Sequence, residues 1–218
     1  MTRTDAKKLI RSGRVSIDGV DTPRADLKIT SQTVTVDNEL IAYPGNETRC
    51  IAFHKPANVE CSHSSSHYPI VFDLLPRTFQ DFQVAGRLDA DTTGLVLLTN
   101  SGQLNHAITH PRRESHKVYR VTAKHPISDE AITQLSNGVV LNDSDTPTQP
   151  ASVVRLSDTE IELTISEGRY HQVKRMLAAV SNRVTGLHRQ AIGRVELDIN
   201  EGEWRELTPK ELEYFNGR

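Results

Sequence analysis

Residues 94–99, GLVLLT, form an almost unbroken apolar run near the middle of the chain. A short continuous run of this kind predicts a strand buried within a sheet. The segment directly in front of it, GRLDADTT, contains an arginine and two aspartates. Charged side chains next to a core are costly unless they are paired or take part in chemistry. This segment is therefore either a polar turn in solvent or a functional site.

The other segments combine short strands with helices. Strands are predicted near residues 50–54, 94–99, 117–123, 151–156, 160–165, 183–188 and 194–198. Helices are predicted at residues 101–108, 129–136, 169–180 and 209–215. Because the strands do not alternate regularly with helices, the pattern predicts an α+β fold. We expect a mixed, mostly antiparallel sheet with flanking helices.

The first part of the chain is predicted to be a small separate module. Residues 4–12 suit a short helix that Gly13 ends, and VSIDG and TVTVDN suit two short strands, the first with an Asp-Gly turn. We expect an N-terminal α/β module over residues 1–43, a linker over 44–49 and the main domain over 50–218.

Composition argues against a membrane-spanning, exported or disulfide-rich protein. Of the 218 residues 36% are hydrophobic and 25% are charged, and no apolar run approaches the roughly 18 residues of a membrane span. The first residues, MTRTDAKKLIRSGRV, lack the apolar core of an export signal. Cys50 and Cys61 alone make no disulfide framework. These features predict a cytoplasmic protein with no membrane partner.

Basic side chains are concentrated in two segments although the net charge is −2. Residues 1–24 carry six basic and three acidic side chains, and residues 112–124 carry five basic and one acidic. Such segments are compatible with a polyanion held in one groove, and equally with solvated surface charge.

A second informative stretch is EGRYHQVKRMLAAV, residues 167–180. Helical spacing places one apolar stripe toward the core: Val173, Met176, Leu177 and Val180. His171, Lys174 and Arg175 share another face near the helix N-terminus, where each cation opposes the helix dipole at a cost of about 0.3–1 kcal/mol. A nearby carboxylate or phosphate would offset that cost, whereas a solvated basic face is the alternative interpretation.

Tyr119 lies in the predicted strand KVYRVTA and shares a face with Val121 and Ala123. This alternation predicts that the ring points inward among apolar neighbours. Spacing alone favours a core tyrosine over a catalytic one.

Spacing argues against three other motif interpretations. DADTT, residues 89–93, matches the DxDxT of a phosphatase class, but Thr99 follows Asp89 too closely for two parallel strands with a crossover. A calcium loop from Asp89 would need a glutamate where Asn100 stands. Cys61, His63 and His67 lack a fourth zinc ligand at a recognisable spacing, so a plain loop is favoured and no metal site is predicted.

Read together, these segments resemble the pseudouridine synthases, and within them the branch that acts on small-subunit ribosomal RNA. The central motif is GRLDxxTxG with the apolar strand after it, and the late motif is EGRYHQVKRM, 167–176. Lys55-Pro56 and HPRRESHKVYRV resemble two further motifs, so the likeness runs in order over residues 50 to about 208. SGRVSIDG resembles part of an S4 RNA-binding domain, of which the first helix is expected to be missing.

The resemblance implies roles for single residues. Asp89 would be the catalytic aspartate, Tyr119 the aromatic that stacks on the target uracil, and Lys174 the cation paired with Asp89. Asp91 lies where the motif is free and is interpreted as a turn residue. Contacts to substrate or RNA are expected from Arg87, Thr92, Lys55, His171, Arg175, Arg11, Arg14, Arg112 and Arg113.

The chemistry of the implied reaction suits these residue types. Uridine becomes pseudouridine when the N1–C1′ bond breaks and the uracil rejoins through C5, which consumes neither water nor redox equivalents, so no cofactor is expected. A carboxylate can attack or stabilise the sugar carbon. Burial raises a carboxyl pKa and a nearby cation lowers it, so an Asp89–Lys174 pair is expected. The base must be flipped out of the RNA.

We therefore expect a monomeric enzyme whose partner is ribosomal RNA, with a uridine of the small subunit as its target. A large-subunit target is the first alternative, because large-subunit synthases share most of this framework. A phosphatase of the DxDxT type and a non-catalytic S4-type RNA-binding protein are more distant alternatives.

Overall fold

The computed structural model describes residues 2–27, 29, 32–41, 48–110 and 115–216. Contacts divide the chain into two compact units, Met1–Glu47 and Thr48–Arg218. This division falls in the segment 44–49 that the sequence predicts as a linker.

The described residues of the first unit form one helix and a small antiparallel sheet. Helix α1 (Arg3–Arg11) is followed by β1 (Val15–Ile17), β2 (Val20–Asp21), β3 (Val34–Val36) and β4 (Glu39–Leu40), in the sheet order β2-β1-β3-β4. Thr2 and Asp5 form a capping box at the start of α1. Asp18 and Gly19 both have positive φ, 50° and 79°, as a two-residue hairpin of the favoured type requires. The predicted Asp-Gly turn thus joins β1 to β2.

The second unit is built on one large sheet. Its strands are β5 (Cys50–Lys55), β6 (Gln83–Ala85), β7 (Thr93–Thr99), β8 (Lys117–Ala123), β9 (Ser152–Arg155), β10 (Glu160–Ile165), β11 (Val184–Ile192), β12 (Val195–Glu196) and β13 (Trp204–Glu206). Its helices are α2 (Gly102–Thr109), α3 (Asp129–Asn137), α4 (Gln172–Ala179) and α5 (Pro209–Asn216), with 3₁₀ turns at Val71–Asp73 and Arg77–Phe79.

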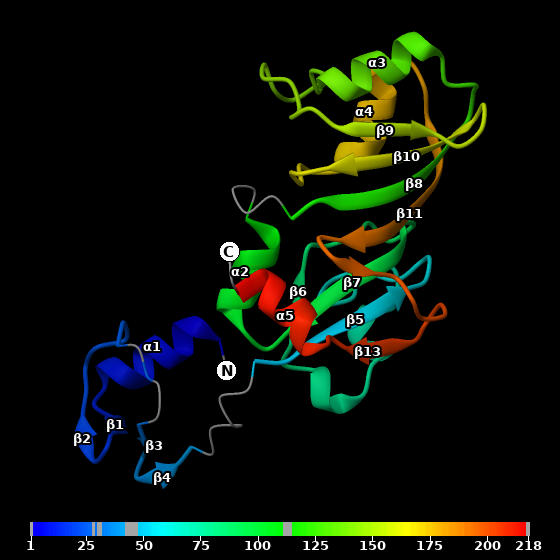
Figure 1. Cartoon of the computed structure of the whole chain (residues 1–218). Coiled ribbons are helices and arrows are strands. Elements are labelled where there is room, and N and C mark those ends of the chain that lie inside the picture. Colours follow the sequence, from blue (N-terminus) through cyan, green and yellow to red (C-terminus); the bar gives the residue numbers. More distant parts are fainter. Residues whose placement is uncertain (1, 28, 30–31, 42–47, 111–114, 217–218) are drawn as a thin grey trace. The chain divides into compact units, whose positions relative to one another are not determined.

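The sheet order is β13-β5-β7-β11-β8-β10-β9, with β6 paired to β7 and β12 to β11. Among the described strands the β7–β11 pair alone is parallel. The predicted α+β class with a mostly antiparallel sheet is confirmed. In Figure 1, α3 and α4 lie beside the β8–β10–β9 part of the sheet, and α2 and α5 lie beside the β5–β6–β7 part.

Strand β7, the GLVLLT run, is buried on both faces. Val96 and Leu98 join the larger apolar cluster, which includes the buried face of α4. Leu95 and Leu97 join a second cluster with α2 and α5 on the other face. Because apolar clusters cover both of its faces, this strand shows no alternation of polar and apolar residues.

A glycine is required where β7 begins. Gly94 has φ +109°, and a Cβ there would lie 2.3 Å from the carbonyl oxygen of Arg189 in β11. The parallel strands therefore approach too closely for any side chain at this position. This is the physical basis of the last glycine in the GRLDxxTxG pattern.

Most predicted elements agree with the structure, but several differ. No strand is predicted at β2 or β4, and the strand predicted at 194–198 covers only Val195–Glu196. The sequence pattern does not predict strands β6 and β13, because each is three residues long and shows little alternation. The strand predicted at 183–188 continues to Ile192. The helix predicted at 169–180 begins only at Gln172, because the residues before it form a separate turn.

Candidate active site

Asp89 lies in the loop between β6 and β7, and its neighbours hold that loop in place. Leu88 and Thr92 are buried, and the amide of Thr92 donates to the carbonyl of Asp89 at 3.1 Å. Gly86, at φ +83°, allows the sharp turn out of β6. The side chain of Asp89 stays 27% exposed between these anchors. It can therefore meet both a protein partner and a ligand.

Lys55 supports this loop from inside the protein. Its side chain is fully buried, and its ammonium donates to the carbonyls of Pro56, Val59 and Ala90 at 2.8, 2.8 and 3.1 Å. These three acceptors use all three N–H groups of a lysine. Burial lowers the pKa of Lys55 below its ordinary value. The expected contact of Lys55 with RNA is therefore replaced by an internal role, holding the backbone next to Asp89.

Two basic side chains at the start of α4 reach Asp89. The ammonium of Lys174 lies 2.8 Å from Oδ2 of Asp89, and Nε2 of His171 lies 3.2 Å from Oδ1. The carboxylate thus offsets the cost of placing basic groups at a helix N-terminus. Lys174 and Asp89 are 85 positions apart in the sequence, and the structure places them in contact as the resemblance implies.

Asp91 belongs to the same cluster, because Lys174 also lies 2.6 Å from its Oδ1. Burial lowers the pKa of Lys174, but its hydrogen bonds and ion pairs with Asp89 and Asp91 outweigh that effect and keep the pKa above its ordinary value. Burial opposes ionisation of Asp91, but the hydrogen bond and charge of Lys174 exceed that effect and lower the pKa of Asp91. The interpretation of Asp91 as a plain turn residue is therefore incomplete.

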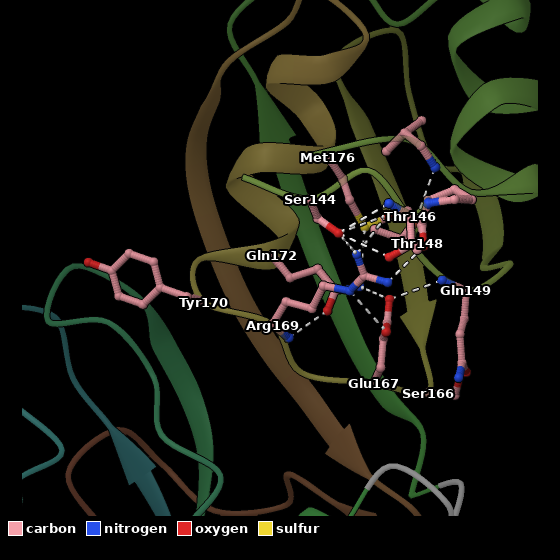
Figure 2. A network of polar contacts seen from close by, with 12 residues as sticks. Ser144, Thr146, Thr148, Gln149, Ser166, Glu167, Arg169, Tyr170, Gln172 and Met176 are labelled. Atoms are coloured by element: carbon pink, nitrogen blue, oxygen red, sulfur yellow. Dashed lines mark hydrogen bonds and ion pairs between the residues drawn. The ribbon is translucent and has the colours of Figure 1, made fainter. Parts of the chain in front are cut away.

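The turn in front of α4 is stabilised by a polar network (Figure 2). Gln172 accepts from the amide of Arg169 at 2.8 Å and donates to Glu167 at 3.0 Å. Arg169 also donates to the carbonyls of Thr146 and Pro147 at 3.0 and 2.7 Å. The ring of Tyr170 points away from this network.

This network explains how His171 reaches the aspartate. His171 has φ +46°, a left-handed conformation that costs a residue other than glycine about 1 kcal/mol or more. Gln172 and its partners hold the turn on one side, and the ring of Tyr170 stacks on His171 at 3.8 Å on the other. The helix therefore starts late, and its first basic side chains face Asp89.

Tyr119 lies on the buried face of β8, as its alternation predicts, and is 7% exposed. Arg189 of β11, which is 1% exposed, places Nη1 3.4 Å from the phenol oxygen. The same guanidinium donates to the carbonyls of Leu95 and Gly86, both at 2.7 Å. One buried cation thus connects the tyrosine to the backbone just before Arg87 and Asp89.

The side chains expected to contact RNA fall into different environments. Arg87 is exposed at the edge of the pocket and forms no hydrogen bond or ion pair with any other residue the structure describes. Arg175 turns away from the pocket and bonds to Asn142, Asp143 and the Tyr170 carbonyl. His171 and Lys174 therefore contact Asp89, whereas Arg175 contacts a different loop. The three side chains do not act together on one face, contrary to expectation.

The described basic side chains of the two basic segments also differ in their environments. In the first unit Arg14 is paired with Asp37, whereas Arg11 is exposed. In β8 Arg120 is paired with Glu160 at 2.8 Å, and Lys117 faces inward. Arg112 and Arg113 lie outside the described residues.

The side chains around Asp89 and Tyr119 surround a pocket of about 670 Å³. Its lining includes Asp89, Thr92, Tyr119, His171 and Lys174 together with Arg87 and Arg189. Among the described residues, no group of three or more His, Cys, Asp or Glu side chains is placed to hold a metal ion. No helix in the described ranges is long and apolar enough to cross a membrane.

Arg189 and Lys117 also line this pocket, although the sequence analysis does not predict either of them as a site residue. Arg189 lies in LHRQAIG, where no local spacing marks a buried arginine. Lys117 could have been identified, because it precedes Tyr119 by two residues and therefore shares its buried face.

Comparison with known proteins agrees with this arrangement. A family model described as RNA pseudouridylate synthase matches residues 49–179. With the fold and the Asp89–Lys174 pair in place, the chain belongs to the RNA pseudouridylate synthase family.

Individual relatives cover nearly the whole chain. The protein of Pasteurella multocida named ribosomal small subunit pseudouridine synthase A is 38% identical over 220 residues, covering 99% of this chain and 94% of the relative. Its namesake from Escherichia coli K12 is 40% identical over 221 residues, covering 97% and 93%. A solved structure described as a pseudouridylate synthase matches with a TM-score of 0.75 at 40% identity, covering 99% of this chain and 94% of that one.

Proposed function

We propose that this enzyme converts one uridine of small-subunit ribosomal RNA into pseudouridine. The single observation that carries the chemistry is the carboxylate of Asp89, held 2.8 Å from Lys174 beside a pocket of about 670 Å³. The choice of small-subunit RNA is supported by the names of relatives that are 38–40% identical over nearly the full chain.

Asp89 would act on the ribose of the target nucleotide. As the N1–C1′ bond breaks, its electron pair moves to the uracil and C1′ becomes electron-poor. A carboxylate can bond to that carbon or stabilise it, and can then leave when C5 attacks. Lys174 and His171 would hold this carboxylate in position, because their side-chain nitrogens lie 2.8 and 3.2 Å from its two oxygens.

Tyr119 would hold the flipped base. Unstacking a base from RNA costs a few kcal/mol, and stacking on an aromatic ring contributes about 1–3 kcal/mol. Tyr119 lines the pocket and is fixed by Arg189. The ring can therefore accept the uracil without reorganising.

RNA outside the pocket would be bound by exposed basic side chains. Arg87 and Arg11 are exposed, whereas Lys55 and Arg175 are engaged inside the protein. We propose that the first unit acts as an S4-type RNA-binding module. We further propose a monomer acting in the bacterial cytoplasm, where ribosomal RNA is found.

The reaction can be measured directly. Forming the C5–C1′ bond expels the hydrogen on C5, so RNA labelled with [5-³H]uridine must release tritium. We expect wild-type protein to release tritium from small-subunit RNA without added metal and in the presence of EDTA, and Asp89→Asn to release none. Tritium release by Asp89→Asn at the wild-type rate would overturn the assignment of the catalytic residue.

The target can be mapped in cells. Ribosomal RNA from a strain lacking this protein should lose one carbodiimide-dependent stop in primer extension. We expect the lost stop in small-subunit RNA. A stop lost only in large-subunit RNA would select the alternative target while keeping the reaction.

A further inference from the structure

Lys117 is a buried lysine whose charge has no partner among the residues that the structure describes. Its side chain is 7% exposed and lines the pocket. Its ammonium forms no hydrogen bond and no ion pair with any residue in the described ranges. An unpaired ammonium in a largely buried side chain is costly, and none of the described residues accepts a hydrogen bond from it.

Lys55 in the same domain shows how a buried lysine is satisfied when its role is structural. Lys55 gives its three N–H groups to three backbone carbonyls. Arg189, the charged neighbour of Lys117, is likewise engaged by Leu95, Gly86 and Tyr119. Lys117 therefore differs from these two buried cations, because within the described part of the chain its donors meet no acceptor.

The ammonium of Lys117 belongs to the same side of the pocket as Tyr119, which would hold the base. Lys117 and Tyr119 are two residues apart on β8, so their side chains leave the same face of the strand. Both line the pocket. Neighbouring side chains on one face of a strand are separated by about 7 Å, which is the scale of one stacked pyrimidine and its substituents.

We propose that Lys117 donates a hydrogen bond to a carbonyl oxygen of the target uracil and stabilises the negative charge that the base gains during the reaction. This inference rests on the proposed function. When the N1–C1′ bond breaks, its electron pair goes to N1 and is delocalised onto O2 and O4. When C5 then bonds to C1′, the base becomes neutral again. The C5 proton afterwards leaves to solvent and N1 gains a proton, which gives neutral pseudouridine. A fixed donor is most effective where charge develops in a site that excludes water.

The depth of Lys117 favours the base over a backbone phosphate. A phosphate is strongly hydrated and stays near the pocket mouth, where the exposed Arg87 can reach it. Lys117 is almost withdrawn from solvent. Burial, with a smaller effect from the charge of Arg189, lowers its pKa to about 8. A weakly solvated donor of this kind suits a developing charge within the pocket.

The test compares Lys117→Met and Lys117→Gln with Lys210→Met, which replaces an exposed lysine of α5. Single-turnover tritium release and filter binding of the same RNA are measured for each. We expect both Lys117 variants to slow the single-turnover step about 10²-fold, while the RNA dissociation constant changes less than about threefold. Lys210→Met should match wild type in both measurements.

The outcomes separate the possibilities. Full single-turnover rates in both Lys117 variants would overturn the proposal, and so would a loss of RNA affinity as large as the loss of rate, which would indicate a phosphate contact. Circular dichroism confirms that each variant is folded. If wild-type protein released no tritium from any ribosomal RNA, the proposed function itself would fail, independently of Lys117.

A substrate change identifies the oxygen. RNA carrying 4-thiouridine or 2-thiouridine at the mapped site replaces one oxygen by sulfur, which is a poorer acceptor. We expect one of the two to slow wild-type protein while leaving Lys117→Met unaffected. Equal slowing of both proteins by each substitution would show that Lys117 contacts neither oxygen.

Discussion

Nη1 of Arg189 lies 3.4 Å from the phenol oxygen of Tyr119, and both side chains are buried. The same guanidinium binds the carbonyl of Gly86, three residues before Asp89. The tyrosine on β8 and the loop that carries the aspartate are therefore fixed relative to each other through one side chain of β11. Preorganisation of this kind lets a site act without rearranging its own groups.

Breaking the Asp89–Lys174 pair should slow the reaction without weakening the binding of RNA. Lys174→Met should reduce the single-turnover rate by about 10²–10³-fold, because it removes the ammonium that holds the carboxylate of Asp89 in place at 2.8 Å. Lys174→Arg should restore most of the rate. Normal RNA binding with full turnover in Lys174→Met would contradict the pairing role.

Tyr119 is expected to act mainly through its ring. Tyr119→Phe should keep a measurable fraction of activity, whereas Tyr119→Ala should lose about 1–3 kcal/mol more, a further 5- to 150-fold, because no aromatic face is left for the base. Steady-state and single-turnover tritium release would measure both. Equal activity in the two variants would exclude stacking.

The close approach of β7 and β11 predicts a stability effect. Gly94→Ala places a methyl group against the Arg189 backbone at positive φ, so we expect a loss of more than about 3 kcal/mol in the free energy of unfolding. Gly102→Ala is the matched control, because nothing lies within 4 Å of its Cβ position; it should change stability by less than about 1 kcal/mol. Urea denaturation of the two variants gives the comparison, and similar values would refute the steric argument.

Lys117 should make stability depend on pH. Its folded-state pKa of about 8 lies below the ordinary lysine value of 10.5, so the unfolded chain binds more protons between these values and stability rises with pH across that window. Lys117→Met should therefore be more stable than wild type at pH 7, by up to about 3 kcal/mol, and the difference should shrink towards pH 10.5. Urea unfolding at pH 7 and pH 10 measures it. A variant less stable than wild type at pH 7 would contradict the unpaired charge.

Arg87 and Arg175 should respond differently to salt. Arg87→Ala should weaken RNA binding and lower the slope of log affinity against log salt by about 1, as expected for one lost phosphate contact. Arg175→Ala should leave that slope unchanged and lower the melting temperature, because it removes bonds to Asn142 and Asp143. Filter binding at several salt concentrations and thermal unfolding distinguish the two. An unchanged slope in Arg87→Ala would remove that residue from the RNA surface.

Local patterns in the sequence are sufficient to predict most of the secondary structure. Strands β8 and β10 have the predicted bounds, because alternation within six or seven residues is decided by which face is buried. The buried β7 strand and the polar loop in front of it are recognisable from their neighbouring residues in the same way. The pairing of Asp89 with Lys174 is implied by the resemblance of the sequence motifs to those of pseudouridine synthases, and it agrees with the expectation that a partly buried carboxylate has a cation beside it.

Tertiary contacts decide the rest. Lys55, Lys117 and Arg175 look alike as basic residues in a sequence, but one is bound by three carbonyls, one meets no acceptor in the described ranges and one is tied to another loop. His171 faces Asp89 because a network on a distant loop holds a left-handed turn that its own residues would not favour. Where most strands and helices form follows from the sequence alone, because it depends on near neighbours. Which residue types carry the chemistry follows from the resemblance of the sequence motifs to those of known synthases. The role of each cation is set only in the folded structure, because it depends on acceptors that lie far away along the chain.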